Sequence, residues 1–209
     1  MIVNGSKSSI SFLRSGVPQG SVLGPMLFLL FIGDISKDVS ASTLVYVDDS
    51  KVKDNIHTEK DVSKLQNNLD NIYLWERENN MQFNGDKFQI LRYGRNKEII
   101  EDTCYFTGNM KFIIEEVESC RDLGVTMENT ARFDLHIEKV CKKVRQKCGW
   151  VLWTFYSRDQ TFLRHMFNTL IQPHIDYCLQ LWTPPEGPEL DKVEKLVKNF
   201  TSKIPGRVR

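Results

Sequence analysis

The chain has few of the features that mark secreted or membrane proteins. Its 5 cysteines are odd in number and none stands in a C-x-x-C pair, which favours an intracellular protein with free thiols. The longest apolar run, Met26 to Ile32, is too short to cross a bilayer. The amino terminus lacks the basic start and long apolar region of a secretory signal. We therefore expect a nuclear or cytoplasmic location, no secretion and no membrane partner.

The chain also carries little net charge. The formal net charge is +1, so a global basic field does not indicate nucleic-acid binding. No Asp or Glu precedes Asp34, and a basic cluster lies later in the chain, at Lys139, Lys142, Lys143 and Lys147. Their spacing places these lysines largely opposite an apolar helix stripe, where they could contact phosphates. A solvated helix face is the alternative explanation for such a run.

The pattern of apolar residues divides the chain into two parts. In the first part we expect a strand or hairpin up to residue 14, a buried helix over 21–35, strands over 43–47 and 50–53, a helix over 59–78, a strand over 88–93, a hairpin around 108–109 and a strand closing near 125. From about Phe133 the pattern is helical only, with helices ending at Pro173, near Trp182 and near the carboxyl end. The fold class is therefore α+β, with an α+β unit over 1–128 and a small helical bundle over 129–209.

Two adjacent carboxylates follow a short apolar strand, in the sequence Tyr46-Val47-Asp48-Asp49. On a regular strand neighbouring side chains point to opposite faces, so both carboxylates could not address one ion. A turn at Asp48-Asp49 lets both contribute, and carboxylate oxygens suit the Mg²⁺ that phosphoryl transfer requires. The alternative is that Asp-Asp is ordinary turn chemistry on the surface.

A loop rich in glycine precedes the first helix, with Gly16, Pro18, Gln19 and Gly20 followed by Ser21. The glycines let the backbone take conformations closed to other residues and let a ligand come near. Ser21 can cap the following helix, whose first amides would then face an anion. Such a loop suits contact with a triphosphate or a template sugar, and a tight strand-to-helix connection without a ligand explains it equally well.

Several of these segments, taken in order, resemble the reverse transcriptases of non-LTR (LINE-type) retrotransposons. The resemblance is carried by GVPQGSVLGP over 16–25, LFLLFIGDI over 27–35, YVDDSK over 46–51 and LGV over 123–125. It covers nearly the whole chain from Ser15 onward, because the region from His136 to Trp182 is similar to the helical segment downstream of that domain. The glycine–proline stretch is the most specific of these motifs.

The resemblance implies roles for individual residues. Asp48 and Asp49 would hold two catalytic Mg²⁺ ions, with Mn²⁺ as a possible substitute, and Lys87 would assist the leaving pyrophosphate. The positions expected near the nucleotide and the template are Gly16, Pro18, Gln19 and Gly20. Those expected near the primer are Tyr46, Val47, Leu123 and Gly124. Lys139, Lys142, Lys143 and Lys147 would contact the nucleic-acid backbone.

The resemblance also implies the architecture and the partners. We expect a partial polymerase palm, an antiparallel sheet with packed helices, followed by a helical thumb bundle. The partners would be an RNA template, a DNA primer and deoxynucleoside triphosphates. In the family a further strand before the glycine loop supplies another metal-binding aspartate, and this chain has no Asp or Glu there. We therefore expect the chain to be inactive alone, the alternative being a non-catalytic remnant that binds nucleic acid through the basic helix.

Overall fold

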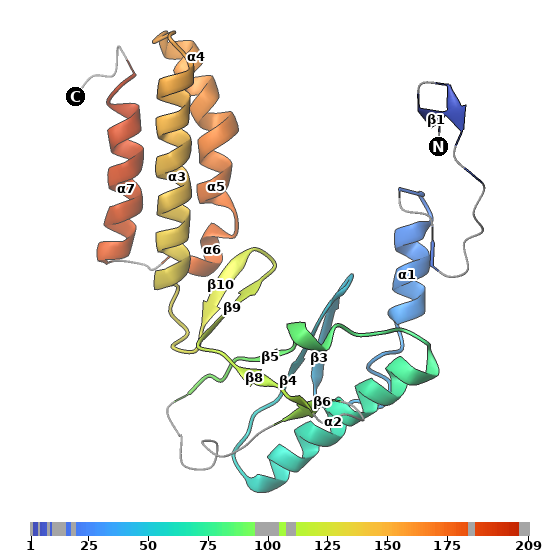
Figure 1. The fold of residues 1–209 in the computed structure, drawn as a ribbon. Coiled ribbons are helices and arrows are strands. Elements are labelled where there is room, and N and C mark those ends of the chain that lie inside the picture. Colours follow the sequence, from blue (N-terminus) through green and yellow to red (C-terminus); the bar gives the residue numbers. More distant parts are fainter. Residues whose placement is uncertain are drawn as a thin grey trace. The chain divides into compact units, whose positions relative to one another are not determined.

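The chain folds into two compact units. The computed structural model describes residues 2–3, 5–7, 9, 16–17, 20–94, 105–107, 112–183 and 187–204. The first unit comprises residues 1–87 and 98–114, and the second comprises 88–97 and 115–209. Both contain helices and short strands (Figure 1), so the predicted α+β class is confirmed. A functional boundary near residue 128 stays a prediction.

The first unit is built from short antiparallel strand pairs, the short helix α1 and the long helix α2 (Figure 1). The pairs are β1 with β2, β3 with β4, and β6 with β7. In chain order the elements are β1 (Ile2–Val3), β2 (Ser6–Lys7), α1 (Gly24–Ile32), β3 (Ser42–Tyr46), β4 (Asp49–Lys53), α2 (Glu59–Glu78), the 3-10 turn η1 (Gly85–Lys87), β6 (Phe106–Thr107) and β7 (Phe112–Ile113).

Helix α2 has the bounds that the sequence predicts, and Thr58 and Asp61 form a capping box at its start. The Asp61 carboxylate accepts hydrogen bonds from the Thr58 backbone N–H at 2.8 Å and from the Thr58 hydroxyl at 2.9 Å, so the first turn is satisfied by its own side chains. The Trp75 indole N–H donates to the Asp34 carboxylate at 2.8 Å. The hydrogen bond between Trp75 and Asp34 ties α2 to the segment that follows α1.

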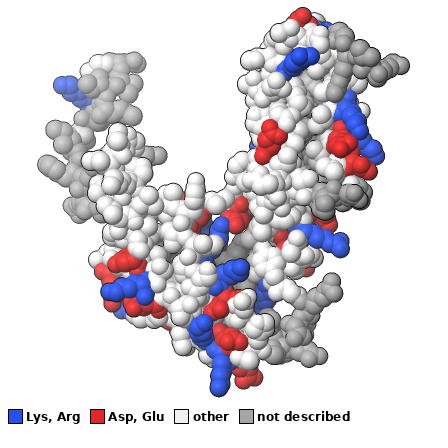
Figure 2. Space-filling model, turned by 180° about the vertical axis from the view of Figure 1, so that it is seen from behind, with Lys and Arg blue, Asp and Glu red and all other residues white. Residues whose placement is uncertain are grey.

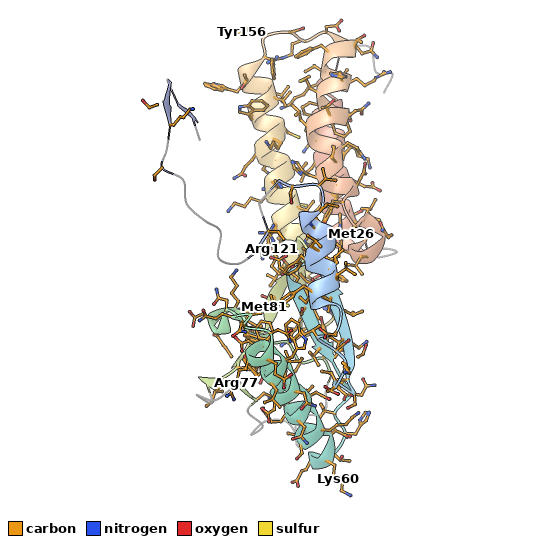
Figure 3. The ribbon with its side chains drawn as sticks, turned by 90° about the vertical axis from the view of Figure 1, so that its right-hand side faces the viewer. Met26, Lys60, Arg77, Met81, Arg121 and Tyr156 are labelled. Atoms are coloured by element: carbon orange, nitrogen blue, oxygen red, sulfur yellow. The ribbon has the colours of Figure 1, made fainter. Side chains whose placement is uncertain are left out.

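Helix α1 is shorter and less buried than predicted. Pro25 lies in its first turn, as expected, but Met26 is 62% exposed and Leu30 is 70% exposed, and Figure 3 marks Met26 on this helix. The prediction of a buried helix is therefore wrong for the described residues. The physical reason is that only one edge of α1 is covered, where Ile32 packs in a small core with Ile72 and Trp75 of α2.

The second unit places short strands beside a group of helices (Figure 1). Its strands pair as β5 with β8, in parallel, and β9 with β10, antiparallel. In chain order the elements are β5 (Gln89–Ile90), β8 (Glu115–Glu116), β9 (Ser119–Asp122), β10 (Val125–Glu128), α3 (Asp134–Thr154), α4 (Gln160–Met166), the π turn η2 (Phe167–Ile171), α5 (Gln172–Asp176), α6 (Leu179–Trp182) and α7 (Pro188–Thr201).

The core of the second unit confirms the predicted apolar helix faces. Val144 and Val151 of α3 are fully buried against Leu163 and Ile171. Because close-packed apolar side chains contribute most of the stability of a small domain, this core fixes α3 against the later helices. Cys141 is part of this core, and burial raises the pKa of its thiol.

Pro173 does not end the second predicted helix. The chain instead passes through the π turn η2 and continues as α5, with Pro173 in the first turn of α5. A proline has no N–H to donate to the preceding turn, and a π turn widens the helix where such a break occurs. No helix among the described residues is both long and apolar enough to cross a lipid bilayer.

Candidate functional site

The carboxylate pair of the first unit lies at the tip of the β3–β4 hairpin. Tyr46 pairs with Asp49, so Val47 and Asp48 are the two central residues of the turn. The turn was expected at Asp48-Asp49, and the structure shifts it by one residue. Asp48 is then a turn residue and Asp49 the first residue of β4, so strict strand alternation does not separate the two carboxylates. Both side chains are exposed.

Val47 has an unusual backbone conformation. Its φ angle is +56°, a left-handed value that a β-branched residue rarely adopts. The first central position of such a hairpin turn normally takes glycine. A residue held in this region costs about 1–3 kcal/mol, and such costs gather at functional sites. The strain therefore lies directly beside Asp48, where the sequence predicts the chemistry.

The donors around this hairpin suit a divalent cation in kind but not in number. Asp48 and Asp49 offer the carboxylate oxygens that Mg²⁺ and Mn²⁺ prefer. Among the residues that the structure describes, no group of three or more His, Cys, Asp or Glu side chains could hold a metal ion. A site for two ions needs more oxygen ligands than two carboxylates provide. The described part of the chain thus carries a partial donor set.

The glycine loop and Lys87 belong to the first unit but to other segments. Gly16 has φ +80° and Gly20 has φ +84°, so both positions require glycine, as expected. Pro18 and Gln19 lie outside the described residues. Ser21 accepts a hydrogen bond from the Gly24 backbone N–H at 3.0 Å, but the N-cap position of α1 is Leu23 and not Ser21 as expected. Lys87 is exposed at the end of η1.

The β9–β10 hairpin of the second unit is held by a residue that the sequence did not single out. Leu123 and Gly124 form its turn with φ angles of +43° and +91°. The Tyr177 hydroxyl donates to the Leu123 carbonyl at 2.5 Å. A Cβ on residue 124 would meet the Tyr177 ring at 3.2 Å. Gly124 is therefore required both by its backbone and by the ring of Tyr177.

A second set of contacts ties the same hairpin to α3. The buried His136 ring accepts a hydrogen bond at Nδ1 from the Thr126 backbone N–H at 3.2 Å. The Lys139 ammonium donates to the Thr126 hydroxyl at 3.0 Å. Burial, and then the charge of Lys139, lowers the pKa of His136, which favours the neutral ring that this acceptor role needs. The hairpin and α3 are thus joined at Thr126.

The predicted basic helix face is present in the second unit. Lys139, Lys142 and Lys143 are exposed, and Lys147 is half-buried. Burial, and then the charges of Lys143 and Lys147, lowers the pKa of His174, so the positive field of these lysines reaches the neighbouring helix α5. On the face of the molecule that Figure 2 shows, by contrast, basic and acidic side chains are interspersed.

The sequence is similar to known reverse transcriptases over most of its length. Residues 1–127 match the family described as reverse transcriptase (RNA-dependent DNA polymerase). Because this match covers more than half of the 209 residues, the chain belongs to the reverse transcriptase family. The resemblance to the RNA-directed DNA polymerases of non-LTR retrotransposons is confirmed by the relatives.

Three relatives come from mobile elements of fruit flies. Two are the RNA-directed DNA polymerases from mobile element jockey of Drosophila melanogaster and Drosophila funebris, both 26% identical over 98% and 97% of this chain and 23% of their own length. The third is the probable RNA-directed DNA polymerase from transposon X-element of Drosophila melanogaster, 25% identical over 81% of this chain and 19% of its own length. The chain thus spans less than a quarter of these relatives. No solved structure matches it.

Proposed function

We propose that this chain is the carboxylate-bearing part of an RNA-directed DNA polymerase of a mobile element. The reaction is the attack of a primer 3′-hydroxyl on the α-phosphate of a deoxynucleoside triphosphate, directed by an RNA template. The observation that carries the proposal is the β3–β4 hairpin, whose register gives Asp48 the turn and Asp49 the first position of β4. This hairpin lies inside the segment that matches the family.

The roles proposed for the other residues follow from their chemistry. Asp48 and Asp49 would hold Mg²⁺ or Mn²⁺, which supplies the positive charge that stabilises the phosphates during transfer. Lys87 is an exposed cation and would balance the charge of the departing pyrophosphate. Tyr46 and Val47 would lie beside the primer end. The residues Gly16, Pro18, Gln19 and Gly20 would meet the nucleotide and the template.

The partial donor set limits what the 209-residue chain would do alone. Among the described residues no third His, Cys, Asp or Glu side chain joins Asp48 and Asp49, so further ligands would have to come from residues beyond those described. We expect the isolated chain to be inactive in primer extension. We also propose a nuclear or cytoplasmic location, which the free thiols of Cys120, Cys141, Cys148 and Cys178 support.

The test is RNA-templated primer extension by a longer polypeptide that contains this chain. We expect extension of a DNA primer with Mg²⁺, none after chelation of the metal by EDTA, and recovery when Mg²⁺ or Mn²⁺ is added back. Extension on RNA that persists in EDTA would contradict the proposal. The matched control is the same primer without a template, which should not be extended.

A second candidate function is nucleic-acid binding without catalysis, and the exposed lysines of α3 favour it. Binding of an RNA–DNA duplex by the 209-residue chain should weaken with rising salt, because phosphate contacts release counterions. Neutralising Lys142 and Lys143 with alanine should reduce the salt dependence by about one to two ions. Duplex binding that is indifferent to salt would dismiss this candidate.

A further inference from the structure

Three aromatic side chains are exposed at one end of the second unit. Trp150 is 46% exposed, Trp153 is 84% exposed and Tyr156 is 98% exposed. Figure 3 marks Tyr156 at the end of α3 that lies away from Arg121 of the β9–β10 hairpin. By contrast, Trp182 of the same unit is only 2% exposed. Tryptophan is rarely left this open to water, and a cluster of such side chains marks an interaction surface.

The exposed tryptophans share a helix face with two of the lysines. The positions 143, 147, 150 and 153 recur every three or four residues, so their side chains follow one side of α3. Lys147 is half-buried and borders the stripe that buries Val144 and Val151 in the core, whereas Trp153 lies on the side of α3 away from that stripe. The Lys147 ammonium lies 5.7 Å from the centre of the Trp150 ring, which joins the cationic and aromatic parts. We call Lys143, Lys147, Trp150, Trp153 and Tyr156 the lysine–aromatic face.

The charges around this face define the chemistry of its partner. Burial, and then the charges of Lys143 and Lys147, lowers the pKa of His174 on the neighbouring helix α5, so these two lysines supply positive charge beside the aromatic side chains. The nearest acidic group in sequence, Asp159, is occupied as the cap of α4, where it accepts from the Phe162 backbone N–H at 2.9 Å. A complementary partner carries negative charges and flat apolar groups together. Unpaired nucleic acid combines both, since its phosphates suit lysines and its open bases stack on aromatic rings.

We propose that the lysine–aromatic face binds single-stranded nucleic acid, with bases stacked on Trp153 and Tyr156 and phosphates along Lys143 and Lys147. Along α3 the distance from Lys143 to Trp153 is about 15 Å at the rise of an α-helix, enough for a few nucleotides. The inference deepens the proposed function, on which it rests, because an RNA template must be unpaired before it is copied. Duplex has its bases stacked inside and offers this face only phosphates.

The experiment measures binding of the 209-residue chain to labelled oligo(dT) and oligo(U) of about 15 nucleotides and to an RNA–DNA duplex of the same length. The double variant Trp153→Ala/Tyr156→Ala should bind a single strand about tenfold more weakly, with its salt dependence and duplex binding unchanged. Trp153→Phe/Tyr156→Phe should restore most of the affinity. Leu181→Ala, which removes another exposed apolar side chain of the same unit, is the control and should have no effect. The two oligonucleotides distinguish a DNA strand from an RNA strand.

Each contrary result has a separate meaning. Equal single-strand affinity of the wild type and the double alanine variant would overturn the inference, whereas metal-dependent primer extension on RNA by the longer polypeptide would leave the proposed function standing. Sedimentation that shows self-association lost in the same variant, with oligonucleotide binding retained, would instead assign the face to a protein partner and also overturn it. Thermal melts should be unchanged, because both substituted side chains are exposed.

Discussion

Two single residues carry left-handed backbone angles at the tips of the two hairpins. Val47 has φ +56° and Leu123 has φ +43°, and neither is a residue type that favours this region. The sequence predicts that Asp48 and Asp49 bind a hard cation, because carboxylates select such ions, and this role stays a prediction. The angle at Val47 could not, because local preferences assign such a position to glycine or asparagine. For the same reason, the sequence did not predict that the turn lies one residue earlier, at Val47-Asp48.

Removing only the hydroxyl group of Tyr177 should lower the stability of the protein. Tyr177→Phe deletes the donor to the Leu123 carbonyl and should lower the free energy of unfolding by about 0.5–1 kcal/mol, since the bond is partly accessible to water. Urea titrations measure the change. Tyr156→Phe is the control, because Tyr156 is 98% exposed and should give no change. Equal midpoints for Tyr177→Phe and the wild type would contradict the role of this bond.

The stability of the protein should depend on pH through the titration of His136. Its pKa is lowered from 6.5, first by burial and then by Lys139, so the unfolded chain binds more protons in the window between the lowered value and about 6.5. The free energy of unfolding should therefore fall as pH drops through that window. Urea titrations from about pH 7.5 to about pH 5.5 should show a shallower slope for His136→Gln. The slope should not vanish, because the pKa of His174 is lowered as well.

Among the elements, α2 and α3 were the most predictable and α1 the least. Helices α2 and α3 carry apolar stripes at helical spacing and pack along them, as Ile72 and Val144 show, so their sequences alone determine which side is buried. Helix α1 is apolar on nearly every side, and its exposure depends on what covers it. Sequence patterns do not contain that information. The same limit applies to Tyr177, which reaches a hairpin 54 positions away in the chain.

Replacing glycine by alanine should have opposite effects on stability in the β9–β10 turn and in helix α3. Gly124→Ala should destabilise the protein by about 1–2 kcal/mol, because alanine is strained at φ +91° and its Cβ would meet the Tyr177 ring at 3.2 Å. Gly149→Ala should stabilise it by about 0.5–1 kcal/mol, because Gly149 lies within α3 with nothing within 4 Å of an added Cβ. Urea titrations of both variants test the pair. A stabilising Gly124→Ala would contradict the described turn.

At the scale of the whole molecule, the family of the chain is established, whereas its catalytic chemistry is a proposal. The match over residues 1–127 establishes the reverse transcriptase family, yet the chain spans 23% of the jockey polymerases. Asp48 and Asp49 lie exposed at the tip of the β3–β4 hairpin, and their binding of metal ions stays a proposal. Catalysis is therefore a property that we assign to a longer polypeptide, and hairpin geometry is what this chain contributes.

The most direct measurement compares primer extension by a longer polypeptide carrying Asp48→Asn, Asp49→Asn or Asp70→Asn within this chain. Each change removes one negative charge and keeps the shape of the side chain. Asp70 lies on α2, where its carboxylate accepts from Gln66 at 2.9 Å. We predict that Asp70→Asn extends a primer on RNA at the wild-type rate, whereas Asp48→Asn and Asp49→Asn lower the rate by about 10³-fold or more. Wild-type extension by either hairpin variant would contradict the assignment of the two carboxylates.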